Sequence, residues 1–310
     1  MFSVSAMNIS VVDSAAGMRR VLDHTVHERA DAVRELWAPM AGMYHFVPGV
    51  DMLGVHSQNF GFPLDMTVQT EQRVREAITA LELADAWVRV RAALQEGVAA
   101  LAAGDLRMLV PDLRVLLLAG DPTNRHFMHE IQGLSAFGGI SGFISMTVWP
   151  TEQVLDRLEA IAVHELHHNV RYSPGGVVWD PVTVTVGEHV VAEGLADLFA
   201  AELYGDRGYT HFVNERTRTD AAVLAKVSSG LNITGMADFA SWVLGDASAR
   251  LFGGEPVGLP TGAGYAAGVR IVQAYLDATG TTAAQNVHTP ARDILAVALP
   301  ALDLNDAGAH

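Results

Sequence analysis

The chain has 310 residues, 50% of them hydrophobic, which is enough apolar material for one large domain or two smaller ones. It contains no cysteine, so disulfides, thiol nucleophiles and cysteine-bound metals are excluded, and any metal site must use histidine and carboxylate ligands. The formal net charge of −15 argues against nucleic acid and acidic lipid surfaces as partners, because phosphate groups are bound by clustered Lys and Arg.

The N-terminal residues predict a cytoplasmic protein. A signal peptide begins with a basic segment and continues with an apolar one, but here the first arginines, Arg19 and Arg20, come late. The longest apolar runs, such as Val110 to Ala119, fall short of the roughly 18 residues that a membrane-spanning helix needs. We therefore expect neither a signal peptide nor a membrane partner.

The first third of the chain predicts a helical region, residues 1–108, that carries no catalytic motif. Apolar residues recur at steps of three and four over residues 14–45, which indicates a helix. Residues 46–66 contain several Pro and Gly and predict a loop. An Ala-rich pattern over residues 68–103 indicates a second long helix that stops near Gly104.

The pattern changes near residue 110, and residues 109–310 predict a second domain that contains strands as well as helices. The apolar run from Leu113 to Leu118 is typical of a buried strand. Residues 135–148 are Gly-rich at first and then β-branched and aromatic, which indicates one or two further strands. The predicted fold class is therefore α+β, mostly helical with a small mixed sheet.

Two helices of this second domain are predicted together with their ends. Thr151, directly after Pro150, is a predicted N-cap for a helix that continues through residues 161–168. A second helix is predicted over residues 185–203 and ends at Gly205, after a loop that is rich in Gly and Pro.

The helix through residues 161–168 carries the pattern H-E-x-x-H at His164, Glu165 and His168. Residues four apart lie on the same face of a helix, so both imidazoles can bind one metal ion. Zinc lowers the pKa of a water molecule that it binds to about 7, and a neighbouring carboxylate can take the proton and return it to a leaving amine. The pattern predicts His164 and His168 as metal ligands and Glu165 as the general base. Scattered surface histidines are the alternative, which the apolar neighbours of the motif disfavour.

A catalytic zinc ion needs a third protein ligand and an open coordination position. Glu193 lies on the next predicted helix, with Asp197 one turn later on the same face. We predict that Glu193 completes the ligand set and that Asp197 accepts a hydrogen bond from the free ring nitrogen of a ligand histidine. An exposed carboxylate pair is the alternative, and Glu188 is the rival ligand, although its position turns it to another face.

These residues resemble those of the gluzincin metallopeptidases, the thermolysin-like clan. The pattern His164-Glu165-x-x-His168 followed by Glu193-x-x-x-Asp197 is similar to that of the clan, which implies two His ligands, a distant Glu ligand and an Asp behind a ligand histidine. More narrowly, the segments HELHHNVRY, AEGLADLFAAELYG and GYAAGVRIVQAYLDATG resemble the DUF2268 family of predicted zinc-dependent proteases, over about residues 110–300. The resemblance implies a zincin-like peptidase domain.

In the clan, a Tyr or His usually hydrogen-bonds the oxyanion that forms during hydrolysis. Tyr265 is the first candidate for this role, because it follows a Gly-rich loop and opens a helix, and a core tyrosine is the alternative. Tyr172, Arg270 and His288 are weaker candidates for the same role, and each is interpreted first as structural. His167 points to another helix face and is interpreted as a residue behind the ligands or at the surface, and His189, one turn before Glu193, as a neighbour of the site.

The Gly-rich strand at residues 137–145 is a candidate edge for pairing with an extended peptide substrate, since such enzymes commonly add the substrate as a strand. Its glycines, Gly138, Gly139 and Gly142, predict close backbone approach. An ordinary glycine-containing strand is the alternative.

The function that these motifs predict is that of a zinc-dependent peptidase with one zinc ion per chain and a peptide or protein substrate. Two other hypotheses stay open: a metal-dependent hydrolase of a non-peptide amide or ester, and a binding or regulatory protein that keeps the scaffold without catalysis. Glu165 argues against the last hypothesis, because a purely structural metal site needs no base.

Overall fold

A computed structural model describes residues 8–104 and 110–302, which form two compact units. The first unit contains residues 8–98 and 110–169, and the second contains residues 99–104 and 170–302. The domain boundary that the sequence predicts between residues 108 and 109 lies outside the described residues.

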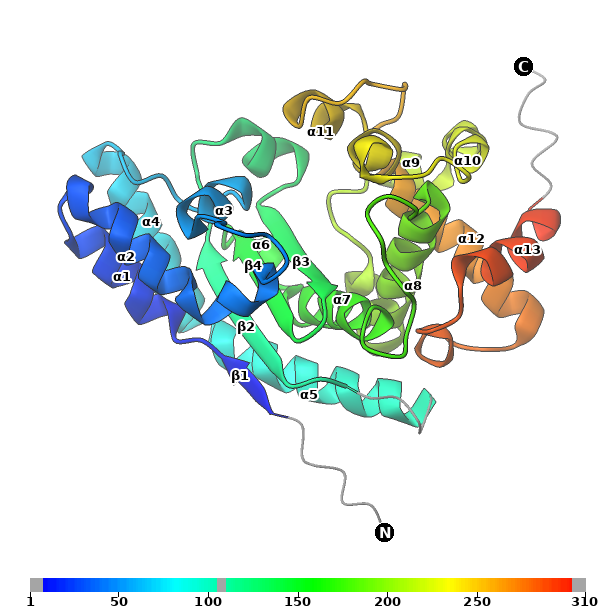
Figure 1. The fold of residues 1–310 in the computed structure, drawn as a ribbon, viewed down its shortest axis with the longest axis horizontal. Helices are drawn as coiled ribbons and strands as arrows, with labels where there is room; N and C mark the ends of the chain where they lie inside the picture. Colours follow the sequence, from blue (N-terminus) through cyan, green and yellow to red (C-terminus); the bar gives the residue numbers. More distant parts are fainter. Residues whose placement is uncertain (1–7, 105–109, 303–310) are drawn as a thin grey trace, which may run out of the picture. The chain divides into compact units, whose positions relative to one another are not determined.

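A mixed four-stranded sheet forms the centre of the first unit (Figure 1). Its strands, in spatial order, are β1 (Ile9–Val11), β2 (Leu113–Ala119), β4 (Phe143–Val148) and β3 (Leu134–Ile140). The pairs β1–β2 and β2–β4 are parallel, whereas β3 and β4 form an antiparallel hairpin that leaves β3 at one edge. Strand β2 is buried at all positions except one, which explains why its sequence is a continuous apolar run.

The helices of the first unit differ from the two long helices that the sequence predicts. They are α1 (Ser14–Asp23), α2 (Val26–Trp37), the 3-10 helix η1 (Ala38–Tyr44), α3 (Met52–Gln58), α4 (Val68–Leu83) and the start of α5 (Ala86–Gly104). The predicted helix 14–45 is interrupted because Thr25 and Glu28 form a capping box that starts a new helix. The predicted helix 68–103 is interrupted at Asp85, whose φ of 52° is incompatible with a right-handed helix. The short α3 lies inside the predicted loop.

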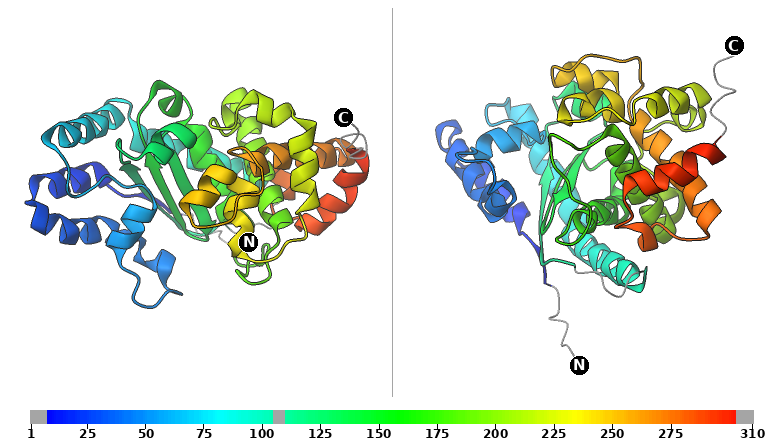
Figure 2. Two further views of the ribbon diagram at one scale, coloured as in Figure 1. Left: turned by 90° about the horizontal axis from the view of Figure 1, so that it is seen from above. Right: turned by 45° about the vertical axis from the view of Figure 1, so that its right-hand side comes forward.

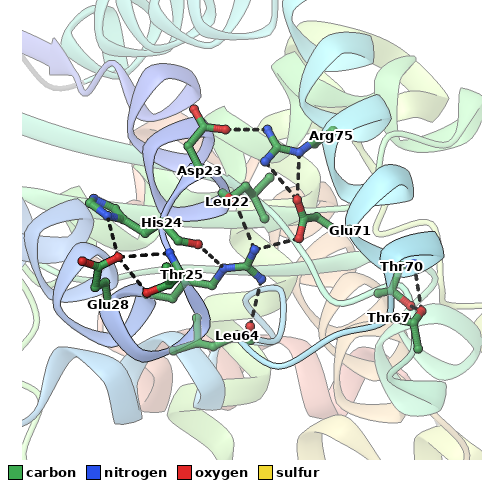
Figure 3. A network of polar contacts seen from close by, with 11 residues as sticks. Leu22, Asp23, His24, Thr25, Glu28, Leu64, Thr67, Thr70, Glu71 and Arg75 are labelled. Atoms are coloured by element: carbon green, nitrogen blue, oxygen red, sulfur yellow. Dashed lines mark hydrogen bonds and ion pairs between the residues drawn. The ribbon is translucent and has the colours of Figure 1, made fainter.

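A buried arginine, Arg29, holds the first helices together. Its partners on these segments are labelled in Figure 3. The guanidinium of Arg29 donates to the carbonyl oxygens of Leu22, His24 and Leu64. It also forms an ion pair of 2.7 Å with Glu71 of α4. Because the same group reaches α1, the loop before α4 and α4 itself, it fixes how these segments pack.

The metal-binding motif lies on α7 (Leu158–Arg171). Thr151 is the predicted N-cap, and its side chain accepts a hydrogen bond from the backbone of Val154, but the helix that it starts, α6 (Glu152–Leu155), stops before α7. From Ala160 to Arg171, every residue of α7 is buried. The motif therefore belongs to the interior and not to a surface helix.

The second unit is helical. It contains α8 (Val186–Tyr204), α9 (Glu215–Thr219), α10 (Ala221–Ser229), α11 (Asp246–Leu251), α12 (Ala263–Thr279), α13 (Ala291–Ala301) and short 3-10 and π segments. As predicted, α8 is followed by Gly205, whose φ of 62° ends it, and Thr185 caps its start. Helix α12, orange in Figure 2, packs against α8.

The predicted α+β fold, mostly helical with a small mixed sheet, is confirmed. Among residues 8–104 and 110–302, no helix combines the length and the apolar character needed to cross a membrane.

We expect the stability of the protein to depend on pH through the buried His56 of α3. Its Nδ1 accepts a hydrogen bond from the indole of Trp37 (3.1 Å), and its Nε2 lies 2.9 Å from the carbonyl oxygen of Phe62. This arrangement fits a neutral ring that carries its proton on Nε2. Burial lowers the pKa of His56 from 6.5 to about 4.

We expect the free energy of unfolding to fall by about 3 kcal/mol as the pH drops from 6.5 towards 4, because the unfolded chain binds a proton there that the folded chain does not. Urea unfolding at several pH values measures this slope. His56→Phe should remove the contribution of His56 to this slope, whereas substitution of the exposed His27 by Gln should leave the slope unchanged. An equal slope in His56→Phe and the unsubstituted protein would contradict the prediction.

Candidate metal centre

The two histidines of α7 point their ring nitrogens at each other. His164 and His168 are buried, and their Nε2 atoms lie 3.1 Å apart. The ring planes are inclined by 77°, with 4.8 Å between the ring centroids. Two imidazole nitrogens bound to one tetrahedral zinc ion at its usual bond length are separated by about 3.3 Å. The pair therefore fits a shared zinc ion.

Glu193 of α8 adds a carboxylate to this pair. One ligand atom from each of His164, His168 and Glu193 can be chosen so that all three atoms lie within 4.8 Å of one another. No other group of three or more His, Asp or Glu side chains in residues 8–104 and 110–302 meets this criterion. All three residues are buried, and two imidazoles with one carboxylate are a ligand set that zinc prefers. The donor chemistry therefore fits zinc.

Close backbone packing holds α8 at the position of Glu193. A Cβ atom on the next residue, Gly194, would overlap the backbone carbonyl group of Gly268 on α12, and one on Gly268 would overlap the carbonyl oxygen of Val190. Only two glycines allow the helices to approach this closely. This close packing leaves the segment of α8 that carries Glu193 little freedom to shift.

The edge strand β3 lies directly against the helix that carries Glu165. A Cβ atom on Gly138 would overlap the carbonyl oxygen of Glu165, so only glycine fits there. The pairing of β3 with β4 is irregular between Phe137 and Ile140, on either side of this contact. The close approach predicted for Gly138 is confirmed.

Asn169, the residue after His168, ties α7 to the β3–β4 hairpin. Its Oδ1 accepts a hydrogen bond from the backbone N–H of Gly142 (2.8 Å). Its Nδ2 lies within 3.0 Å of three carbonyl oxygens, those of Gly138, Ile140 and Phe143. An amide has two N–H donors, so three acceptors share them. The fully buried side chain thereby serves four backbone groups.

Glu188, the rival ligand, has a different partner. Both of its carboxylate oxygens accept hydrogen bonds from the guanidinium of Arg171, at 2.7 and 2.9 Å. The hydroxyl of Tyr172 donates to the same carboxylate at 3.0 Å. Burial and the charge of Glu188 raise the pKa of Tyr172, so this hydroxyl stays protonated. The expectation that Glu188 faces away from the ligands agrees with these contacts.

Asp197 is buried and bound to a residue that the sequence did not single out. The hydroxyl of Thr210 donates to its Oδ1 at 2.7 Å, and the backbone N–H of Thr210 lies 3.2 Å from Oδ2. A threonine in a loop carries no sequence signal for this contact. The hydrogen bond predicted between Asp197 and a ligand histidine stays a prediction.

Tyr265 lies in the first turn of α12 and is partly buried against the apolar core of the second unit. Its ring makes an edge contact with Phe212, with 5.6 Å between the centroids. The alternative interpretation, a core tyrosine, therefore applies to part of the side chain. Its role as an oxyanion donor stays a prediction.

The remaining candidates contact residues that are distant in the sequence or are buried. His189 packs its ring against Phe239, with 4.7 Å between the centroids. Arg270 donates to the carbonyl oxygen of Asp220 at 3.0 Å. His288 Nε2 lies 2.9 Å from the carbonyl oxygen of Val170, and His167 is fully buried on α7.

An α+β protein with a buried group of two imidazoles and one carboxylate is of the class that can bind zinc. Residues 95–296 match the family model described as "Predicted Zn-dependent protease (DUF2268)". The match covers more than half of the chain, so the chain belongs to this family, as its motifs predicted.

One curated relative is the "Uncharacterized protein YjfC" of Bacillus subtilis (strain 168). It is 32% identical over 194 residues, which are 61% of this chain and 62% of the relative. The chain thus spans less than two thirds of the length of that protein. No solved structure matches the chain.

We expect Asn169→Ala to lower the free energy of unfolding by about 2–4 kcal/mol, because it leaves several buried backbone groups without a hydrogen bond. Urea unfolding measures the change. The same substitution at the exposed Asn8 is the control and should change the stability by less than about 0.5 kcal/mol. Equal effects at the two positions would show that the contacts of Asn169 add nothing.

Proposed function

We propose that the protein is a zinc-dependent peptidase of the gluzincin type. His164, His168 and Glu193 hold one zinc ion, and Glu165 is the general base. The observation that carries the proposal is the buried group of three ligand atoms within 4.8 Å of one another, with Glu165 on the same helix as two of them. The family description supports the same function.

A zinc ion held by His164, His168 and Glu193 would supply Lewis acidity, which makes water nucleophilic near neutral pH. The carboxylate of Glu165 then acts on protons: it accepts one from the attacking water and donates it to the amine that leaves. Glu165 follows the first ligand directly in the sequence, and the residue is buried. Asp197 fixes the ring of a ligand histidine, and Tyr265 donates its hydroxyl to the oxyanion.

We propose that the substrate is an extended peptide that pairs with β3. This strand forms one edge of the sheet, so one side of its backbone is left without a strand partner. At Gly138 it lies directly against the backbone of Glu165. A peptide added along β3 would run past the base, which suits hydrolysis of a backbone amide.

The base is tested with Glu165→Gln. This substitution should reduce the hydrolysis of a fluorogenic peptide library by at least about 100-fold and leave the zinc content unchanged, because the amide keeps the shape but cannot accept the proton. Substitution of the exposed Glu152 by Gln is the control and should retain full activity. If Glu165→Gln hydrolyses the library at the same rate as the unsubstituted protein, Glu165 is not the base.

The third ligand is tested with Glu193→Gln. It should weaken zinc binding by more than about 100-fold, since loss of an outer partner alone already costs 10–100-fold. Competition with a chromophoric chelator measures the zinc dissociation constant. Glu202→Gln, on the same helix, is the matched control, because its carboxylate accepts hydrogen bonds from the backbone of Ala283 and Ala284. Unaltered zinc affinity in Glu193→Gln would refute the ligand assignment.

A further inference from the structure

The Arg171–Glu188 ion pair is buried and geometrically complete. The side chain of Arg171 is 0% exposed and that of Glu188 is 10% exposed. Nε and Nη2 of the guanidinium each donate to a different carboxylate oxygen, so the contact is bidentate. Such a fork sets the distance between two groups and also their orientation.

The guanidinium of Arg171 also forms hydrogen bonds with the loop before α13. Its Nη1 donates to the carbonyl oxygens of Val287 (2.9 Å) and Thr289 (3.1 Å). Between these residues, the Nε2 of His288 lies 2.9 Å from the carbonyl oxygen of Val170. The last turn of α7 is therefore held from two sides, by α8 and by this loop.

Each partner of the pair lies close to a proposed zinc ligand on its own helix. Arg171 follows His168 by three residues on α7, and Glu188 precedes Glu193 by five residues on α8. At a rise of 1.5 Å per residue, these separations are about 4.5 and 7.5 Å along the helix axes. A shift of the end of α7 against the start of α8 would be transmitted almost in full to the ligand positions, because helices are stiff over one or two turns.

We propose that Arg171 and Glu188 are positioning residues for the metal: their ion pair sets the separation of His168 and Glu193 at which both bind one zinc ion. The inference rests on the proposed function and extends it to residues that touch neither metal nor substrate. A buried ion pair is a weak source of stability compared with apolar residues of similar size, because both charges lose their hydration. Unlike apolar residues of similar size, the ion pair fixes the orientation of Arg171 and Glu188 relative to each other. A set of metal ligands requires such a fixed orientation.

This difference allows a test that separates positioning from stability. In the double variant Arg171→Met/Glu188→Leu, apolar groups of similar volume replace both charges, so the fold is expected to remain while the fork is lost. The zinc dissociation constant should rise by 10–100-fold. The visible absorption spectrum of the Co²⁺-substituted protein should also change, because it reports the geometry of the ligands directly.

The control applies the same exchange to another ion pair, in Arg29→Met/Glu71→Leu. That pair joins α2 and α4 and belongs to the first unit, away from both ligand-bearing helices in the sequence. The zinc dissociation constant of this control variant should stay within twofold of that of the unsubstituted protein. Its Co²⁺ spectrum should not change.

The inference is overturned if Arg171→Met/Glu188→Leu is folded, as measured by circular dichroism, and keeps both the zinc affinity and the Co²⁺ spectrum of the unsubstituted protein. If this variant does not fold, Arg171→Lys decides by the same two measurements, since lysine keeps the charge but has no planar fork. Failure of the unsubstituted protein to bind zinc would instead refute the proposed function, from which the inference starts. If the unsubstituted protein binds zinc and hydrolyses peptides but Arg171→Met/Glu188→Leu is unaffected, only the positioning role is refuted.

Discussion

The buried stretch of α7 imposes one constraint on everything around it: polar side chains removed from water must find partners inside the protein. Asn169 finds them in four backbone groups of the β3–β4 hairpin, and Arg171 in α8 and the loop before α13. The imidazoles of His164 and His168 turn towards each other, and a cation shared with the carboxylate of Glu193 would satisfy both at once. Residues of this one helix thereby form hydrogen bonds with the β3–β4 hairpin through Asn169, and with α8 and the loop before α13 through Arg171.

The parts of this arrangement that are local in sequence could be predicted. The spacing of His164 and His168 places two rings on one helix face whatever the rest of the fold does. Thr151, Thr185 and Gly205 mark helix ends through contacts with residues at most four positions away. Glu193 could be predicted as well, because a carboxylate among apolar neighbours on a helix needs a buried partner.

The parts that depend on distant residues could not be predicted. Arg171 binds groups as far along the chain as Thr289, and nothing in its neighbourhood indicates that loop. The contact of Thr210 with Asp197 is of the same kind. The helix break at Asp85 was missed for a different reason: hydrophobic periodicity continues across this left-handed residue, so a change of direction leaves no mark on the pattern.

Strand β1 has a practical consequence for work on this family. Residues 95–296 carry the similarity to other family members, and β1, with residues Ile9–Val11, lies far outside them. Yet it is β1 that covers the outer side of the nearly fully buried β2. A recombinant fragment trimmed to the matched residues would keep the pairing of β2 with β4 but would expose the other edge of this apolar strand, which favours intermolecular sheet formation. A fragment that keeps both edges of β2 paired must therefore include β1, which lies outside the residues that match the family model.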